Sequence, residues 1–392
     1  MNGIAPKRID WVMISTLILL LIISTLFIYS AQFQAIGSVG STWQRQLTFS
    51  LVGLVLYWVA AWFDYRKLIR LAPWIYPSTL LLLLLVFLFP AVNGAHRWIA
   101  LPGFTLQPSE LAKPATLLML AAYLAAPDRD HTTHRTFLIS AAILLCPLLL
   151  IALEPDLSSA LVMVPAALAI FLYADIKRKW ILSAIGTLLL AATLLCGWIK
   201  YEAPLPSTAD AQNVPTSQWK LPPVPLLEPY QKERIRVFLS DEVDTADAGW
   251  NKLQAQVAVG SGGFRGKGYL QGSQNILGFL PRTVAPTDFI FCVIAEEMGF
   301  IGSLSILLLY TLLLGRCLRT AWRAPDEFGR MVALGISTLL FCHIFINIAM
   351  TIGLLPITGL PLPLMSYGGS FMISTLVALG IIQSIYQRRR IR

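Results

Sequence analysis

The chain has 392 residues, of which 56% are hydrophobic and 13% are charged, and its mean hydropathy is +0.67. This composition excludes a soluble globular protein and a disordered chain, and it predicts an integral membrane protein. The net charge of +9 gathers in alternate loops and at the termini. Such a pattern reflects membrane topology and gives no reason to expect nucleic-acid binding.

About ten apolar windows are long enough to cross roughly 30 Å of hydrocarbon as helices. They begin near Trp11, Leu47, Leu71, Leu111, Thr136, Leu157, Trp180, Asp288, Arg330 and Gly369. Because the first window is about 20 residues long, we expect an uncleaved helix there and not a signal peptide. The sequence therefore predicts an all-α membrane protein in which residues 1–392 form one polytopic domain.

Positive charges concentrate in every second loop and at both ends of the chain. The clusters are Lys7 and Arg8; Arg66, Lys67 and Arg70; Arg129 and Arg135; residues 177–179; residues 316–330; and residues 388–392. The opposite short connections hold few positive charges, mainly Arg45 and Arg97. The positive-inside rule therefore predicts that both termini are cytoplasmic, in agreement with an even number of spans.

The longest polar segment, residues 200–286, is expected on the outer face. Its first part is rich in proline between Pro204 and Pro229 and is expected to be extended or irregular. From Tyr230 onward the pattern suits short interfacial amphipathic helices. The Gly-rich run that follows is no Walker A motif, because Lys267 precedes a glycine instead of Ser or Thr. Its backbone N–H groups remain candidates for cradling a lipid diphosphate.

Asp288 opens an apolar window that continues through Glu296 and Glu297 to about Gly315. A charged side chain costs roughly 2.5–3.5 kcal/mol near the centre of a bilayer span, so three carboxylates in one helix indicate a functional site. On an ideal helix Glu296 lies about 12 Å deeper than Asp288 and Glu297 lies on the opposite face. We therefore assign chemistry to Asp288, nearest the aqueous edge, and expect Glu296 and Glu297 to form internal pairs.

Residues 107–113 place further charges at the expected outer end of a helix. Ser109 is positioned as an N-cap, and Glu110 and Lys113 are three residues apart, so they can share one helix face. The motif predicts either a capped helix with a local ion pair or an anion contact from Lys113. Asp156, in residues 154–159, allows a similar choice between a helix cap, which we favour, and a site residue.

Arg45 and Arg97 are isolated cations near the expected outer face. Trp98 beside Arg97 suits the membrane interface, and a guanidinium there either snorkels to water or binds phosphate. His96 and His343 have no partner at metal-ligand spacing, so a catalytic zinc is not expected.

Several runs, in chain order, resemble the SEDS family of bacterial cell-wall polymerases, the group of RodA and FtsW. They are NGAHRWI, QPSELAK, EPDLSSA, YQKERI, QVAVGSGGFRGKGYLQGSQ, FLP, TDFIF, AEEMG and GLLPITGLPLPLMSYGGS. Together they extend across nearly all of the predicted helices. The run GFRGKGYLQGSQ followed by FLP is more similar to the elongation branch, RodA, than to the division branch, FtsW.

The resemblance implies a peptidoglycan glycosyltransferase of the bacterial inner membrane that polymerises lipid II on the outer face during cell elongation and releases undecaprenyl diphosphate. Asp288 matches the family's essential aspartate and suits a general base for the acceptor hydroxyl. The expected substrate-binding residues are Arg45, Arg97, Glu110, Lys113, Asp156 and Lys267, whose cations would face the diphosphate. A divalent cation, Mg²⁺ or Mn²⁺, could share that task, although the sequence shows no dedicated metal site.

The chain departs from the family pattern in three places. Residues 281–286 lack the Glu and His that usually precede Thr287 and Asp288, EPDLSSA replaces PDLGTA, and Ser240 stands where proline is common. None of these departures removes Asp288. The alternatives to an elongation polymerase are a division polymerase, a lipid II flippase and a scaffold without chemistry. The resemblance also implies partners, namely a class B penicillin-binding protein and other membrane proteins of the elongation complex.

Overall fold

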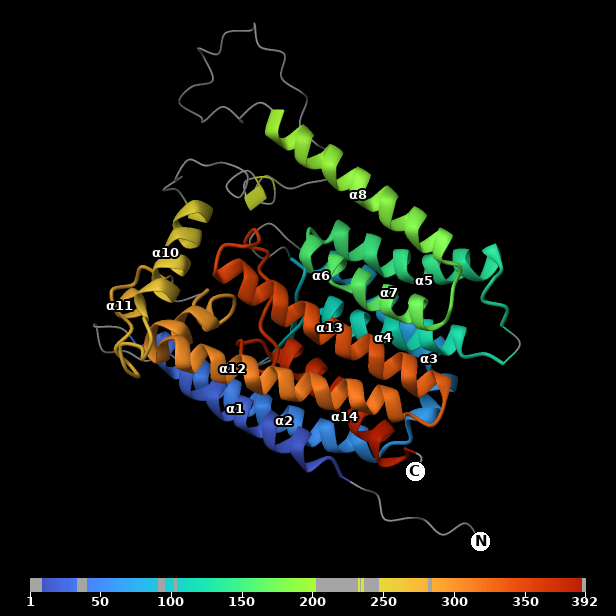
Figure 1. Cartoon of the computed structure of the whole chain (residues 1–392), viewed down its shortest axis with the longest axis horizontal. Coiled ribbons are helices and arrows are strands. Elements are labelled where there is room, and N and C mark those ends of the chain that lie inside the picture. The colour runs from blue at the N-terminus through green and yellow to red at the C-terminus, as the bar shows by residue number, and fades with distance from the viewer. Residues whose placement is uncertain are drawn as a thin grey trace, which may run out of the picture.

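The structure is a computed structural model of the whole chain (Figure 1). It describes residues 9–33, 41–90, 96–101, 104–127, 129–201, 232, 234–235, 247–280 and 284–389. Most of these residues are helical, as the sequence predicts. The proline-rich segment 204–229, predicted to be irregular, lies outside the described residues, as do Ser240 and residues 281–283.

A helix overlaps each of the ten predicted windows. The helices are α1 (Trp11–Gln32), α2 (Thr42–Trp62), α3 (Leu68–Leu85) with its flanking turns η1 (Tyr65–Lys67) and η2 (Val86–Leu88), α4 (Pro108–Leu124), α5 (His134–Leu153), α6 (Leu157–Leu161), α7 (Met163–Tyr173), α8 (Arg178–Tyr201), α10 (Asp247–Ser261), α11 (Ser273–Ile276), α12 (Ile290–Arg323), α13 (Glu327–Thr351) and α14 (Gly369–Gln387). Seven helical segments in the described part are long and apolar enough to cross a membrane. The number of spans and the cytoplasmic position of both termini remain predictions.

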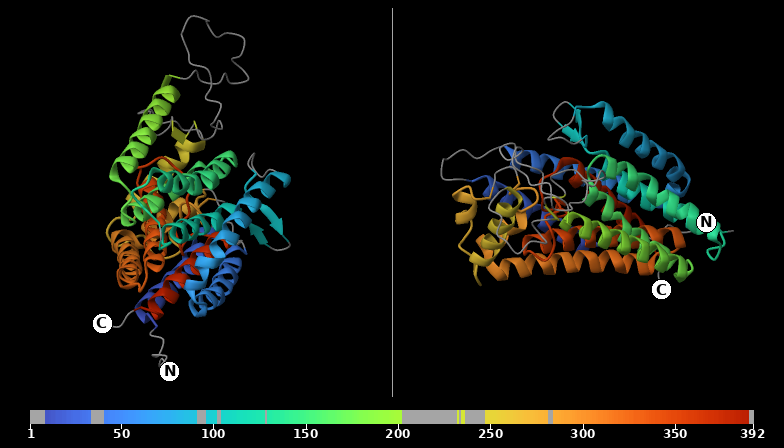
Figure 2. Two further views of the ribbon diagram at one scale, coloured as in Figure 1. Left: turned by 90° about the vertical axis from the view of Figure 1, so that its right-hand side faces the viewer. Right: turned by 90° about the horizontal axis from the view of Figure 1, so that it is seen from above.

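One small β-hairpin departs from the all-helical expectation. Strand β1 (Ile99–Leu101) pairs antiparallel with β2 (Phe104–Leu106). Figure 2 shows the hairpin at the edge of the bundle, beyond the end of α3. Its two strands bond to each other, and Thr105 O of β2 also accepts from Ser370 Oγ of α14 at 2.8 Å, which ties the hairpin to the bundle.

Side-chain caps set several helix starts. Asp10 accepts a hydrogen bond from Met13 N at 3.2 Å at the start of α1, and Asp156 accepts one from Ser159 N at 3.3 Å at the start of α6. The cap predicted for Asp156 is therefore confirmed, whereas the cap predicted for Ser109 is wrong. Helix α4 begins at Pro108, two residues earlier than a cap at Ser109 would place it, and a proline at this first position has no N–H of its own left to satisfy.

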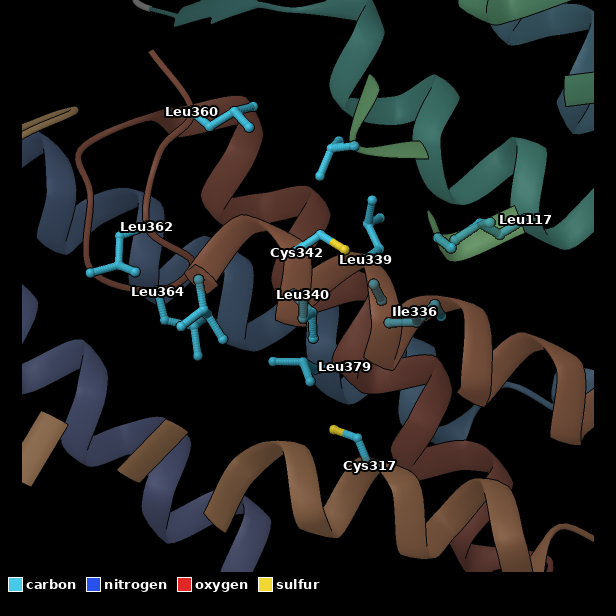
Figure 3. Packing of buried hydrophobic residues seen from close by; sticks show 14 of the residues in the cluster. Leu117, Cys317, Ile336, Leu339, Leu340, Cys342, Leu360, Leu362, Leu364 and Leu379 are labelled. Atoms are coloured by element: carbon cyan, nitrogen blue, oxygen red, sulfur yellow. The ribbon is translucent and has the colours of Figure 1, made fainter. Parts of the chain in front are cut away.

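Helix α13 lies in the middle of the bundle, and its apolar side chains form much of the core. Figure 3 shows Ile336, Leu339 and Leu340 of α13 close to Leu379 of α14 and to Leu364 of the last connection. All five are buried. Helix α8, in contrast, extends away from the bundle (Figure 1) and has large exposed leucines, which suits contact with lipid.

Helix α12 is interrupted near its first third. Gly299 has φ 63° and ψ −157°, which L side chains do not adopt without strain. The prediction that Asp288 opens one continuous helix is therefore wrong in two respects. Asp288 lies in a turn before α12 begins at Ile290, and α12 itself breaks at Gly299. The break allows the backbone of Gly266 to lie against Gly299.

We predict that Gly299→Ala destabilises the protein by about 1–3 kcal/mol, because the strained backbone would carry a Cβ directed at Gly266. Thermal unfolding of the purified protein in detergent measures the effect. Gly315→Ala is a matched control, since it lies in the same helix with nothing within 4 Å of the added Cβ. An unfolding temperature for Gly299→Ala equal to that of the control would contradict the prediction.

Candidate active site

The backbone around Asp288 is held by the last connection, residues 352–368. Residues 284–289 form turns, so their carbonyl groups lack the regular partners of a helix. Tyr367 N donates to Pro286 O at 2.8 Å, and Ser366 Oγ donates to Thr287 O. Two successive carbonyls before Asp288 are thus fixed by one neighbouring loop. As the prolines predict, that loop is not a continuous helix.

Asn347 of α13 fixes the next carbonyl. Its side-chain Nδ2 donates to Asp288 O at 3.0 Å and to Leu360 O at 2.7 Å, and the residue is fully buried. One amide group therefore ties the Asp288 turn to the last connection. Because a buried carbonyl left without a donor costs free energy, Asn347 limits where the Asp288 carboxylate can lie.

Arg234 lies near the Asp288 carboxylate and acts on it electrostatically. Arg234 Nη1 and Asp288 Oδ2 lie 3.3 Å and 3.5 Å from the position that a Cβ would take on Gly359, whose φ is +77°. A side chain at Gly359 would therefore press on both groups. Burial raises the pKa of the half-buried Asp288 above its ordinary value, and the charge of Arg234 partly offsets this increase.

Sequence reasoning did not name Arg234 as a site residue. The available signal was the charged run YQKERI, which matches the family pattern within the long external segment. The sequence does not show that Arg234 acts on Asp288, because the two residues are far apart in the chain. The described residues between them include α10 and α11.

Glu110 and Lys113 form a buried ion pair. Lys113 Nζ lies 2.8 Å from Glu110 Oε1 and 3.2 Å from His343 Nε2, and the Lys113 and Glu110 side chains are 2% and 4% exposed. The Lys113 ammonium also lies over the Phe371 ring, 5.6 Å from its centroid. His343 precedes Asn347 by four residues, about one helical turn. The pair is therefore close, along α13, to the residue that holds Asp288.

Arg97 and Asp156 meet at the turn between α5 and α6. Arg97 Nε donates to Glu154 O at 3.0 Å, and its Nη2 donates to Pro155 O. The Asp156 side chain caps α6 and also accepts from Gln107 Nε2 at 3.2 Å. These contacts give Arg97 and Asp156 structural partners in the turn.

The same turn reaches the Asp288 site through the last connection. Ser158 Oγ donates to Thr358 O at 2.7 Å, next to Gly359. Glu154 is fully buried, and neither carboxylate oxygen has a hydrogen-bond partner among the described residues. Burial, followed by the charge of Asp156, raises the pKa of Glu154 to about 9, so this carboxyl is protonated at neutral pH.

Lys267 binds the start of α12. Its Nζ donates to Glu296 Oε1 at 2.6 Å and to Ser273 Oγ at 2.7 Å, while its backbone N–H donates to Glu296 O at 3.0 Å. The next N–H, of Gly268, donates to Glu297 O at 2.9 Å. We call residues 262–274 with these contacts the glycine clasp. The pairing expected for Glu296 is confirmed, and two of the clasp's N–H groups are used on α12.

Arg45 lies apart from these groups. It belongs to the first turn of α2, and its side chain is exposed. As for metals, no three His, Cys, Asp or Glu side chains within the described ranges lie together as a possible ligand set. The residues around Asp288 thus offer one carboxylate and one guanidinium, which suits proton transfer and anion binding better than binding of a resident cation.

The helical bundle, its apolar outer surface and the charged groups inside it define a multi-pass membrane protein with a carboxylate site. A family model described as "Cell cycle protein", for FtsW, RodA and SpoVE, matches residues 10–391. The chain belongs to this FtsW/RodA/SpoVE family, and it is therefore a multi-pass protein of the bacterial inner membrane.

Relatives agree in length as well as in sequence. The peptidoglycan glycosyltransferase MrdB of Escherichia coli (strain K12) is 36% identical over 384 residues, which are 98% of this chain and 95% of that protein. The peptidoglycan glycosyltransferase RodA of Treponema pallidum (strain Nichols) is 33% identical over 426 residues, covering 97% and 98% of the two chains. A chain solved in work titled "Structural coordination of polymerization and crosslinking by a peptidoglycan synthase complex" is similar at a TM-score of 0.76, with 29% identity and coverage of 97% and 98%.

We predict that Lys113→Met destabilises the protein by about 3–5 kcal/mol, because it leaves Glu110 buried without its counter-charge. The double variant Glu110→Gln with Lys113→Met should be less destabilised than Lys113→Met alone. Thermal unfolding in detergent measures both. Arg66→Met serves as a control, because its pair with Asp326 is exposed and should contribute at most about 1 kcal/mol. Equal losses in the single and double variants would count against a coupled pair.

Proposed function

We propose that this protein is a peptidoglycan glycosyltransferase that polymerises lipid II into glycan strands on the outer face of the cytoplasmic membrane during cell elongation. The observation that carries the proposal is the Asp288 site. A half-buried carboxylate with a raised pKa lies beside Arg234, in a backbone turn that α13 and the last connection hold in place. Full-length similarity to MrdB and RodA favours the elongation role over the division role.

Asp288 is proposed as the general base. Its carboxylate would accept the proton of the acceptor sugar hydroxyl as that oxygen attacks the anomeric carbon of the donor. A new glycosidic C–O bond forms, and the bond from the anomeric carbon to the diphosphate oxygen breaks. The proton remains on Asp288 until it is released to solvent. A raised pKa brings a carboxyl closer to the operating pH, where a base works best.

The leaving diphosphate requires positive charge in the proposed reaction. Arg234 supports this role best, since it lies beside Asp288. Lys113 is proposed to add positive charge from its position near Asn347 on α13, although its ammonium is buried and paired with Glu110. Arg45 is exposed and suits a first contact with an incoming lipid diphosphate. The Lys267 side chain is 28% exposed, although Glu296 already binds its ammonium group.

Glu110, Arg97 and Asp156 are proposed as supports of the substrate site. Glu110 holds the Lys113 ammonium, and Arg97 and Asp156 shape the turn that meets the last connection through Ser158. We assign no step to Mg²⁺ or Mn²⁺, because the described residues around Asp288 supply no ligand set for a resident cation. Lipid II and undecaprenyl diphosphate are the proposed substrate and product.

A transpeptidase partner also belongs to the proposal. The similar solved chain comes from work whose title couples polymerisation with crosslinking in one complex. A class B penicillin-binding protein that crosslinks the new strand would be the corresponding partner here, together with other membrane proteins of the elongation complex. The exposed apolar surface of the bundle suits contacts with partner helices within the membrane.

We predict that Asp288→Asn lowers the rate of glycan-strand synthesis from purified lipid II about 10²- to 10⁴-fold, because the amide cannot accept the proton. The amount of glycan strand formed over time, resolved on gels with and without the transpeptidase partner, measures the rate. Asp175→Asn is the matched control. Asp175 is exposed at φ +57°, where asparagine is also tolerated, so strand synthesis should be unchanged.

The same experiment distinguishes the proposed function from a flippase and from a scaffold. If Asp288→Asn makes strands at the wild-type rate, the general-base role is wrong. If no sample makes strands while vesicles containing the protein move lipid II across the bilayer in an Asp288- or Glu296-dependent way, the flippase hypothesis gains. Full tolerance of changes at Asp288 and Lys113, with partner binding intact, would support a scaffold.

We predict that Arg234→Gln shifts the acidic limb of the kcat/KM profile to higher pH. The base is active when deprotonated, so activity falls as pH decreases through the pKa of Asp288. Since Arg234 lowers that pKa, its removal raises it further, and the variant should lose more activity in mildly acid than in alkaline buffer. Strand synthesis over a pH series tests this. An acidic limb unchanged from wild type, or one shared with the exposed control Arg178→Gln, would refute the assignment.

A further inference from the structure

A charged cavity lies away from the Asp288 site. It has a volume of about 840 Å³ and lies between the end of α7, the end of α12 and the first turns of α13. These ends lie at the side of the bundle where the C-terminus is found (Figure 1). Its lining has four aliphatic, two cationic and two aromatic side chains: Leu318, Ala321, Ala324 and Leu334; Arg323 and Arg330; and Tyr173 and Trp322.

The two arginines differ in how they are held. Arg330 donates to Ala324 O at 3.3 Å, to Tyr173 Oη at 3.2 Å and to Glu327 Oε1 at 3.1 Å, so its guanidinium is fixed across three helix ends. Arg323 is the last residue of α12 and is exposed. The cavity thus combines one positioned guanidinium with one that can move to meet a ligand.

The charge of the cavity remains positive after its two acidic neighbours, Glu327 and Asp326, are considered. Asp326 also acts on Arg330, but it is paired with Arg66. Glu327 is next to the cavity, and its carboxylate accepts from Tyr173 Oη at 2.6 Å as well as from Arg330. It can therefore offset one of the two arginines. Arg323 then leaves a net positive charge at the mouth, which favours an anionic ligand.

The position of the cavity indicates a lipid. The surrounding basic clusters, residues 316–330 and 177–179, are those that the positive-inside rule places in the cytoplasm. Trp322 is 86% exposed, and an indole in that position suits the level of the lipid head groups. Leu318 is also exposed and continues the apolar wall along α12, where an acyl chain can follow it.

We propose that this cavity binds an anionic phospholipid of the cytoplasmic leaflet. Its phosphate pairs with Arg323 and Arg330, and an acyl chain lies along Leu318 and Leu334. Basic pockets between membrane helices on the cytoplasmic side bind such head groups, and the arginine fork fits a phosphate well. The site does not depend on the proposed catalytic function, because it shares no residue with the Asp288 site.

The test uses the full chain in nanodiscs that contain brominated phosphatidylglycerol or brominated phosphatidylcholine. Bromine quenches the fluorescence of nearby tryptophans. The part of the quenching that disappears in Trp322→Phe comes from Trp322 and therefore reports lipid at the cavity. We expect stronger quenching of Trp322 by phosphatidylglycerol than by phosphatidylcholine. Arg323→Gln should reduce this preference roughly five-fold, the factor expected for one interfacial arginine.

Arg319→Gln is the matched control, because it removes the same charge from an exposed position on α12 outside the cavity lining. Its lipid preference should equal that of wild type. Three results would overturn the proposal: no preference in wild type, an equal loss in Arg319→Gln, or displacement by inorganic phosphate as effective as by unlabelled phosphatidylglycerol. Protection of Trp322 from both brominated lipids in the nanodiscs would also overturn it, because a protein segment would then cover the cavity.

Discussion

The site depends on one constraint, that backbone carbonyls buried in a membrane protein must find donors within the protein. The turns at 284–289 break the helical pattern where Asp288 is needed, so the carbonyls of Pro286, Thr287 and Asp288 require other partners. Residues 347, 366 and 367 supply those partners. The last connection therefore helps to fix the backbone of the Asp288 turn, and this backbone determines where the carboxylate lies.

Charged groups inside the bundle obey a related rule. Lys113 pairs with Glu110, and Lys267 pairs with Glu296, so these charges are compensated locally and contribute to structure. Asp288 differs because it is half-buried, whereas Glu110 and Glu296 are buried against the ammonium groups that they bind. A carboxyl that is partly open to its surroundings can exchange a proton with a substrate.

Much of the architecture could be predicted from sequence, because the length of an apolar segment depends only on residues that are neighbours in the chain. All ten apolar windows overlap helices, and the Asp156 cap and the Glu110–Lys113 pair need only residues a few positions apart. The Gly299 break could not be predicted in this way, since its cause is the glycine clasp packed against it. Arg234 was missed for the same reason, because its relation to Asp288 exists only in the folded chain.

The contacts around Asp288 differ in how far apart their partners lie in the sequence, so some of them can form earlier during synthesis than others. Lys267 and Glu296 are 29 residues apart, so the glycine clasp can close as soon as the first turns of α12 have been synthesised. Asn347 and Ser366 lie 59 and 79 residues from the carbonyls that they bind. A nascent chain that has inserted α12 therefore has its clasp but still lacks the donors that orient Asp288. The turn that carries Asp288 therefore acquires its full set of donors only after α13 and the last connection have been added to the chain.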